Sequence, residues 1–173
     1  GFVTHIVNPD FRLGTVVSLY AAKSVLCGGT EVLMMDADVL YTRTLIERLL
    51  NSSNLDCLLV DQGFEPGDEP VKVCIEGRKI VDFGKKISRE YETVGEWPGF
   101  MRMSPRIANR MAEACAAIID AGKSERPCED AMYDVLMGEP GVIGYEDVTG
   151  EPWIEIDFPE DLNRARDIIL PQL

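Results

Sequence analysis

The chain has 173 residues, of which 46% are hydrophobic, so it can bury a core without disulfide bonds or a structural metal. Its 30 acidic and 17 basic side chains give a formal net charge of -13, which opposes binding to a nucleic-acid backbone. No apolar run reaches the roughly 18 to 20 residues that span a bilayer, and the first residues lack the layout of a signal peptide. We therefore expect a soluble, cytoplasmic protein without a nucleic-acid or membrane partner.

The five cysteines are scattered, without the paired spacing of zinc or redox sites, and are expected to be free thiols. His5 is the only histidine, which excludes a metal site made of several histidines. A bound nucleotide would need nearby lysines or a metal ion to overcome the acidic field of the protein.

Strand and helix patterns alternate through the first 60 residues. We expect strands over residues 2–7, 31–35 and 56–60, and helices over residues 15–26 and 42–50. This alternation is typical of a parallel sheet covered by helices, with ligands at the carboxyl ends of the strands. The expected fold class is α/β, with a mostly parallel central sheet flanked by helices in a single domain over residues 1–173.

The pattern changes after residue 70. Residues 71–75 and 79–83 flank a turn that contains Gly77 and are expected to form a β-hairpin. The remaining predicted elements are an extended segment over residues 99–103, helices over 105–121, 129–137 and 160–169, and strands over 142–145 and 153–156. Ser104 followed by Pro105 is typical of a helix N-terminus.

The first chemical signal is an apolar run, residues 32–35, that leads directly into Asp36 and Asp38. In an α/β sheet this is where a divalent cation and its phosphate ligand bind. Thr42 or Thr44 is better placed to cap the following helix, which leaves the two acids for another role. A three-residue motif of this kind is weak on its own, because it recurs by chance in many chains.

The second signal is Glu155 and Asp157, at the end of another apolar segment. Alternation along a strand places both side chains on the same face. Pro159 suits the first helical position, so Phe158 becomes the cap and Asp157 lies just outside the helix. Two acidic strand ends repel each other unless a cation lies between them. We therefore predict that Asp38 and Asp157 meet in space.

Four residues outside these motifs each have two interpretations. Lys72 and Lys85 lie on or beside the hairpin, and either reach a phosphate or face solvent. Trp97 either forms the wall of a ligand pocket, stacked on a cationic amine, or packs in the core. Asp130 either lines a site or simply favours the positive end of a helix dipole.

Several short segments occur in a characteristic order over nearly the whole chain. They are Asn8-Pro9, residues 14–19, residues 35–39, Lys72-Val73 with residues 77–80, Gly95-Glu96 with Gly99-Phe100, and residues 153–157. This succession resembles the nucleotidyltransferases of the phosphocholine cytidylyltransferase type, which have the nucleotide-diphospho-sugar transferase fold. Members join a nucleoside triphosphate to a phosphorylated alcohol, sugar or phosphonate and release pyrophosphate. The resemblance implies a Mg²⁺-dependent enzyme that uses CTP or another triphosphate and a small phosphorylated acceptor.

The resemblance also implies roles for individual residues. Asp38 and Asp157 become the catalytic Mg²⁺ ligands, and Asp36 supports them at the nucleotide. Gly14 and Ser18 fall where the family approaches the base and ribose. The implied acceptor-binding residues are Lys72, Lys85, Glu96, Trp97, Asp130 and Glu155. Residues 1–61 would then belong to the nucleotide-binding half, and residues 62–173 would form the acceptor-binding half. An acid-rich pocket with one tryptophan suits an amine-bearing acceptor such as phosphocholine or aminoethylphosphonate, and leaves an inositol phosphate or sugar phosphate open.

The sequence departs from this family in one respect, because it contains no glycine-rich L-x-A-G-x-G-x-R loop, which cradles the triphosphate. We therefore expect an N-terminally incomplete fold, an inactive chain in isolation, and an exposed sheet edge that would allow a homodimer. Three alternatives remain, and one of them is a metal-dependent glycosyltransferase that uses the D-x-D motif, Asp36 to Asp38, on a sugar nucleotide. In a haloacid-dehalogenase-type phosphatase, Asp36 would be the nucleophile and Asp38 the general acid. In a non-catalytic remnant, the chain would still bind a nucleotide.

Overall fold

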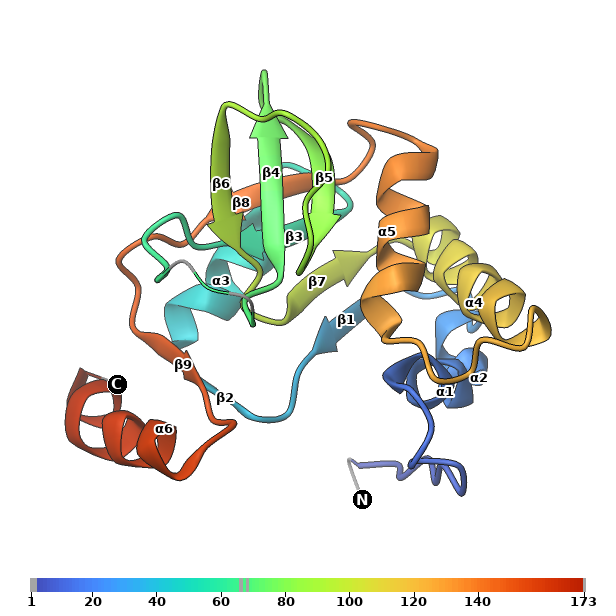
Figure 1. Cartoon of the computed structure of the whole chain (residues 1–173), viewed down its shortest axis with the longest axis horizontal. Coiled ribbons are helices and arrows are strands. Elements are labelled where there is room, and N and C mark those ends of the chain that lie inside the picture. The colour runs from blue at the N-terminus through green and yellow to red at the C-terminus, as the bar shows by residue number, and fades with distance from the viewer. Residues whose placement is uncertain (1–2, 66, 68, 173) are drawn as a thin grey trace. The chain divides into compact units, whose positions relative to one another are not determined.

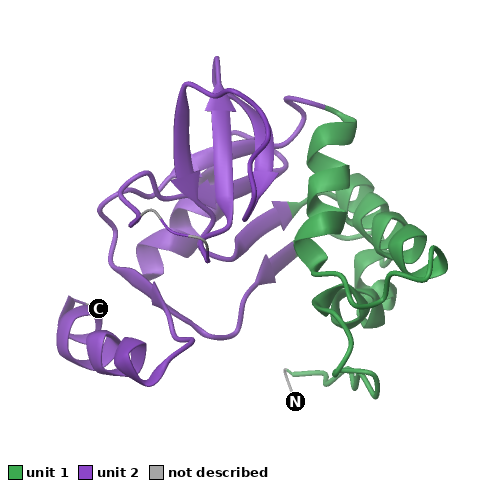
Figure 2. Ribbon diagram, in the orientation of Figure 1, with its two compact units in different colours: residues 1–32, 103–139 green, residues 33–102, 140–173 purple. Residues whose placement is uncertain are grey.

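The computed structural model describes residues 3–65, 67 and 69–172, and divides into two compact units (Figures 1 and 2). Unit 1 comprises Gly1–Val32 and Met103–Glu139, and unit 2 comprises Leu33–Arg102 and Pro140–Leu173. These units are defined by which residues pack together. The predicted division after residue 61 is of another kind, because it separates a nucleotide-binding half from an acceptor-binding half. That division stays a prediction.

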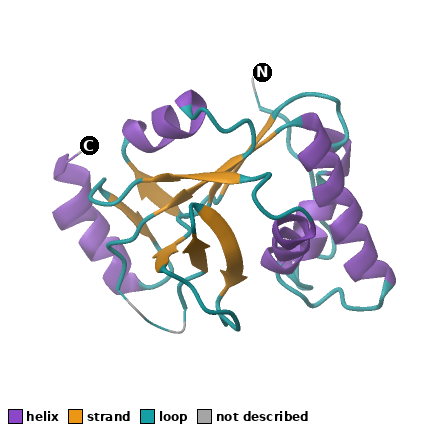
Figure 3. Cartoon of the chain, turned by 90° about the horizontal axis from the view of Figure 1, so that it is seen from above, coloured by secondary structure: helices purple, strands orange, loops and turns teal. Residues whose placement is uncertain are grey.

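Unit 1 is helical apart from its loops and the end residues of two strands, as Figure 3 shows from a second direction. Its helices are α1 (Thr15–Ala21), α2 (Lys23–Leu26), α4 (Pro105–Asp120) and α5 (Cys128–Gly138). The predicted helix over residues 15–26 is interrupted at Ala22, whose ψ angle of 13° is not helical. Helix α4 buries Ile107, Ala108, Met111, Ala112 and Cys115, the apolar stripe expected from the 3.6-residue period.

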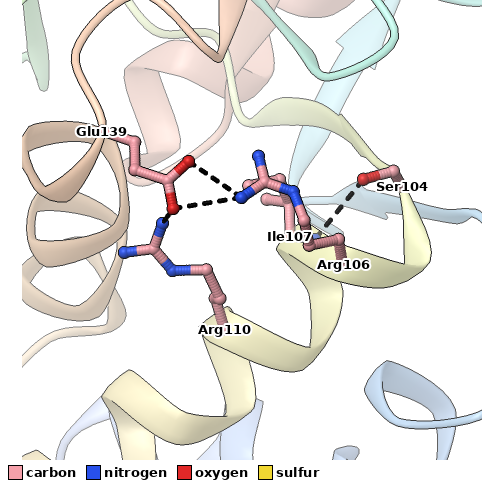
Figure 4. A network of polar contacts seen from close by, with 5 residues as sticks. All are labelled: Ser104, Arg106, Ile107, Arg110 and Glu139. Atoms are coloured by element: carbon pink, nitrogen blue, oxygen red, sulfur yellow. Dashed lines mark hydrogen bonds and ion pairs between the residues drawn. The ribbon is translucent and has the colours of Figure 1, made fainter.

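Polar contacts fix the start of α4 (Figure 4). The Ser104 hydroxyl accepts a hydrogen bond from the Ile107 backbone N–H at 3.4 Å, and Pro105 occupies the first helical position. Arg106 in the first turn and Arg110 one turn further both donate to the Glu139 carboxylate, which follows the end of α5. The predicted N-terminus of this helix is therefore confirmed, and Glu139 links it to α5.

Unit 2 is built around a four-stranded sheet in the order β1-β7-β3-β8. The strands are β1 (Val32–Met35), β7 (Phe100–Met103), β3 (Cys57–Val60) and β8 (Gly144–Asp147). Strand β3 pairs in parallel with β8 and antiparallel with β7. The α/β class with a central sheet is confirmed. The sheet is mixed, however, where a mostly parallel one was expected. A parallel neighbour needs a helical crossover connection, and β7 instead follows the hairpin region directly.

Helix α3 (Arg43–Asn51) packs on this sheet through Leu45 and Leu49. These side chains form a fully buried cluster with Cys57, Leu59, Phe100 and Val148. At one edge of the sheet, Leu33 and Met35 of β1 are 39% and 43% exposed. The expected exposed sheet edge corresponds to β1 at the end of the strand order, and such an edge is a site where strands of other chains can pair.

A second sheet in unit 2 has three antiparallel strands in the order β5-β4-β6. They are β4 (Lys72–Glu76), β5 (Lys79–Gly84) and β6 (Thr93–Glu96). The predicted hairpin is confirmed, and its turn uses left-handed backbone at Gly77 (φ 52°) and Arg78 (φ 66°), as two-residue hairpins require.

A separate two-stranded ribbon pairs β2 (Val39–Tyr41) with β9 (Trp153–Glu155) (Figure 1). The chain continues into α6 (Pro159–Arg164), a π-helical turn (Ala165–Ile169) and a 3-10 turn (Leu170–Gln172). Phe158 is the N-cap residue of α6 and Pro159 its first residue, as predicted.

One predicted strand is absent from the structure, and two observed strands were not predicted. No strand forms over residues 3–7, which are all exposed, and Phe2 lies outside the described residues. Strands β2 and β6 were not predicted, because three or four residues are too short for a recognisable alternation.

Candidate metal and substrate site

The acids of the two predicted motifs lie together in unit 2. One carboxylate oxygen each of Asp38, Glu155 and Asp157 lies within 4.8 Å of the others, and all three residues are exposed. Oxygen ligands in this arrangement suit a hard divalent cation such as Mg²⁺. We call these three residues the acidic trio.

The β2–β9 ribbon brings the trio together. Its antiparallel register pairs Val39 with Glu155, and the Ile156 N–H donates to the Asp38 carbonyl at 2.9 Å. Asp38 therefore lies opposite Ile156, just past the end of the ribbon, with Glu155 and Asp157 on either side of Ile156. We expected parallel strand ends to converge. The acids instead meet through a local antiparallel ribbon, because the chain bends between β1 and β2 and leaves the four-stranded sheet.

Asp36 lies within this bend and is half-buried against Gly99. Its backbone N–H donates to the Gly99 carbonyl at 3.0 Å, and a side-chain carbon on Gly99 would lie 2.7 Å from the Asp36 carboxylate. Gly99 also has a φ of 89°, a conformation that favours glycine. The glycine thus leaves room for the Asp36 side chain beside the trio. Neither Asp36 nor Asp38 caps α3, because Thr42 occupies that position.

Negative charge accumulates at the site. Loss of solvation, followed by the charges of Asp157, Asp38 and Asp36, raises the pKa of Glu155 to about 7, although the residue as a whole is exposed. Loss of solvation and the charges of Glu155 and Asp61 likewise raise the pKa of Glu96 to about 7, against an opposing effect of Lys72. A cation would relieve this repulsion.

Asp61 is a residue of this region that the sequence analysis missed. It exchanges both backbone hydrogen bonds with Glu96, and its carboxylate accepts from the Trp153 indole N–H at 2.8 Å. Asp61 directly follows the buried strand β3, so it carries the same signal as Asp36, an acid at a strand end. It joins Glu96 to the ribbon that holds the trio.

The predicted acceptor residues of unit 2 have different surroundings. Lys72 opposes Glu96 across β4 and β6, and Lys85 forms an ion pair with Glu69 at 2.8 Å. Trp97 is only 6% exposed, donates its indole N–H to the Phe100 carbonyl at 3.0 Å, and stands edge-on to Phe83. Of its two interpretations, packing in the core is the one that the structure favours, since almost none of the ring is accessible to a ligand.

Gly14, Ser18 and Asp130 belong to unit 1. A side-chain carbon on Gly14 would lie 2.0 Å from the Arg126 carbonyl, so close backbone packing alone requires glycine there. The Ser18 hydroxyl accepts a hydrogen bond from the Asn8 side chain at 2.9 Å. Asp130 forms an ion pair with Arg126 and lines a cavity of about 420 Å³ between α4 and α5. Their predicted roles in substrate binding stay predictions.

The raised pKa values lead to an expected pH dependence of stability. Glu96 and Glu155 have folded pKa values of about 7 against an ordinary value of 4.5, so between these values the folded state holds protons that the unfolded chain releases. Stability without metal should therefore fall as the pH rises from 4.5 to 7. Thermal melts across this range should show a smaller decrease for Glu96→Gln, whereas Glu113→Gln, at an exposed position of α4, should follow the wild type. An unchanged slope in Glu96→Gln would contradict the expectation.

No helix among the described residues is long and apolar enough to cross a membrane.

No family model matches the chain. Two curated proteins, each named bifunctional IPC transferase and DIPP synthase, are similar to it. The protein of Rubrobacter xylanophilus is 28% identical over 168 residues, which cover 95% of this chain and 36% of that protein. The protein of Thermococcus kodakarensis is 24% identical over 165 residues, with coverage of 95% and 34%. The chain thus spans about a third of the length of these relatives.

Solved structures are similar to the chain over nearly its whole length. The inositol-1-phosphate CTP transferase from T. maritima matches with a TM-score of 0.71 and 16% identity, over 95% of this chain and 64% of that chain. The CTP:phosphocholine cytidylyltransferase from Streptococcus pneumoniae matches with a TM-score of 0.68 and 14% identity, over 93% and 66%. The chain therefore has the nucleotide-diphospho-sugar transferase fold of these nucleotidyltransferases.

Proposed function

We propose that the chain is part of a nucleotidyltransferase that joins CTP to a small phosphorylated alcohol and releases pyrophosphate. The observation that carries the proposal is the acidic trio, three carboxylates within 4.8 Å of one another on a nucleotidyltransferase fold. The names of two of the similar solved proteins favour CTP as the triphosphate, and the acceptors in those names are phosphorylated alcohols.

The donor set of the trio fits Mg²⁺, which prefers oxygen ligands and is held in proteins by a few carboxylates together with substrate phosphates. Asp38 and Asp157 would hold the ion, and Glu155 offers a third oxygen. When bound, the ion would supply positive charge that neutralises the triphosphate. Without it, the excess negative charge of the site repels the nucleotide.

The protein itself has to position two anions for an in-line displacement. An acceptor phosphate oxygen attacks the α-phosphorus of CTP, one P–O bond forms, the bond between the α- and β-phosphates breaks, and pyrophosphate leaves. Lys72 and Lys85, whose charges act on Glu96 and Glu155, bring the positive charge that an acceptor phosphate requires. The half-buried Glu96 carboxylate adds an acceptor for a hydroxyl or amine group of that substrate.

The experiment is an assay of pyrophosphate release by the full-length protein with each of the four nucleoside triphosphates and several acceptors, including inositol 1-phosphate and phosphocholine. We expect release that requires CTP, Mg²⁺ and one acceptor together. The 173-residue chain alone should show none, since the printed sequence contains no glycine-rich triphosphate loop. Release of inorganic phosphate from the acceptor without any triphosphate would instead support the phosphatase alternative.

A further inference from the structure

The acidic trio is shared between the two strands of the β2–β9 ribbon. Asp38 directly precedes β2, whereas Glu155 ends β9 and Asp157 follows soon after. The three carboxylates therefore come together only while the two strands are paired. Each strand has three residues, and a two-stranded ribbon by itself is marginally stable at best in water. Contacts outside the ribbon are needed to hold both strands in place.

Strand β2 is anchored by apolar packing and by its connection to α3. Tyr41 packs on the buried cluster that contains Leu45 and Phe100, with its ring edge-on to that of Phe100 and the centroids 4.8 Å apart. Two residues after Tyr41, the chain enters α3, whose Leu45 belongs to the same cluster. The strand next to Asp38 is thus held without help from β9.

Strand β9 is anchored through Trp153, the register partner of Tyr41. Its half-buried ring packs on the same cluster, and its indole N–H donates to one carboxylate oxygen of Asp61 at 2.8 Å. The other Asp61 oxygen accepts from the Gly63 backbone N–H at 2.7 Å. Apolar packing is not directional, so it is the hydrogen bond to Asp61 that fixes the orientation of the indole.

Asp61 itself is held at a fixed place. It directly follows β3, and its backbone exchanges two hydrogen bonds with Glu96, at 2.8 and 2.9 Å. Gly95 permits this approach, because a side-chain carbon there would lie 2.3 Å from Val60 and 2.8 Å from the Asp61 carbonyl oxygen. Asp61 therefore offers Trp153 an acceptor that is attached to both larger sheets of unit 2.

We propose that Asp61 is a positioning residue for the cation of the acidic trio. By holding Trp153, it keeps β9 paired with β2, and thereby keeps Glu155 and Asp157 beside Asp38. The binding of a cation by the trio rests on the proposed function. The role of Asp61 rests on its own contacts, since donors of the protein occupy both of its carboxylate oxygens.

The test measures Mn²⁺ binding to the 173-residue chain by electron paramagnetic resonance, in two variants that break this hydrogen bond from opposite sides. Trp153→Phe removes the donor and keeps every charge. Asp61→Asn removes one charge and offers a single acceptor oxygen to two donors. Each should weaken Mn²⁺ binding by about threefold or more, the size of effect found between residues of one hydrogen-bond network. The double variant should bind no more weakly than the weaker single variant, because both changes break the same contact.

Cation binding should also act back on the hydrogen bond, because coupling between two sites is reciprocal. The chain has two tryptophans, and NMR follows the indole N–H signal of each. Mg²⁺ should slow the exchange of the Trp153 N–H with solvent, and Asp61→Asn should speed it. The Trp97 N–H, which donates to the Phe100 carbonyl, is the internal reference and should stay unchanged in both cases. A residue needed only for folding would give no response to Mg²⁺.

Asp147→Asn is the matched control. Asp147 ends β8 opposite Val60, and its carboxylate accepts from the Gln62 side chain at 2.9 Å and the Thr149 N–H at 2.8 Å. The change removes one negative charge near the end of β3 and should keep wild-type Mn²⁺ binding. Thermal melts establish a temperature at which every variant is folded. If Asp61→Asn does not fold, Trp153→Phe and the NMR signals carry the test.

Wild-type Mn²⁺ binding by Trp153→Phe would overturn the proposal, because a loss in Asp61→Asn alone would then reflect only the charge of Asp61. Additive losses in the double variant, or a Trp153 signal that Mg²⁺ leaves unchanged, would do the same. Failure of the proposed function is distinguishable from these results. Mn²⁺ binding that depends on Trp153, combined with no pyrophosphate release by the full-length protein, would refute only the function. Mn²⁺ binding and pyrophosphate release that are both unchanged in Trp153→Phe would refute only the role of Asp61.

Discussion

Asp38→Asn or Asp157→Asn in the full-length protein should lower turnover by about a hundredfold or more, equivalent to about 2.7 kcal/mol of transition-state stabilisation. Each change removes one of the three carboxylates that lie within 4.8 Å of one another. Folding should be unaffected or slightly stabilised, because the metal-free site loses one of its mutually repelling charges. Pyrophosphate release and thermal melts on the same samples check both parts.

The matched control for these variants is Asp167→Asn, which changes an exposed carboxylate that pairs with Arg166 outside the site. It should keep wild-type turnover. A loss of folding in Asp38→Asn or Asp157→Asn, in place of a loss of activity, would assign the trio a structural role and remove the support for the proposed function.

Arg102→Met should destabilise the fold by about 3 kcal/mol or more. Arg102 is 7% exposed, and its guanidinium donates to the carbonyls of Leu50, Ser52, Asn54 and Leu55, where α3 ends and the chain turns into β3. Methionine fills similar space but leaves these carbonyls without their donor. A hydrogen bond to a charged group such as this guanidinium contributes about 1.5–3 kcal/mol.

Equilibrium urea unfolding measures this loss, with Arg43→Met as the control. Arg43 is the first residue of α3, but its side chain is 90% exposed and pairs with Glu47 of the same helix. Its removal should cost about 0.3–0.5 kcal/mol. Equal losses for the two variants would show that Arg102 does not organise the end of α3.

Local signals were enough to predict most elements of the fold. Ser104 followed by Pro105 indicated the start of α4, because a serine hydroxyl can accept a hydrogen bond from a first-turn N–H. Gly77 indicated the hairpin turn, because glycine readily adopts the positive φ that the turn needs. Strand pairing could not be predicted in the same way. The antiparallel contact of β3 with β7 and the β2–β9 ribbon join segments far apart in the chain, and no local pattern specifies their register.

In the candidate site, too, local patterns could be predicted and long-range packing could not. Alternation along the chain was enough to place Glu155 and Asp157 on one face, and the structure brings Asp38 to them. The surroundings of Trp97 and Lys72 could not be predicted, because burial of the indole and capture of the ammonium by carbonyls depend on tertiary packing. Asp61 was missed although it follows a buried strand, since a single acid in an acidic protein is not distinctive.

The most direct test of the central claim is a titration of the 173-residue chain with Mn²⁺, followed by the electron paramagnetic resonance signal of the free ion. We expect one weakly bound ion, which Mg²⁺ displaces and which Asp38→Asn and Asp157→Asn abolish, whereas Asp167→Asn retains it. Equal Mn²⁺ binding by the wild type, Asp38→Asn and Asp157→Asn would contradict the account, because the acidic trio would then not be a cation site.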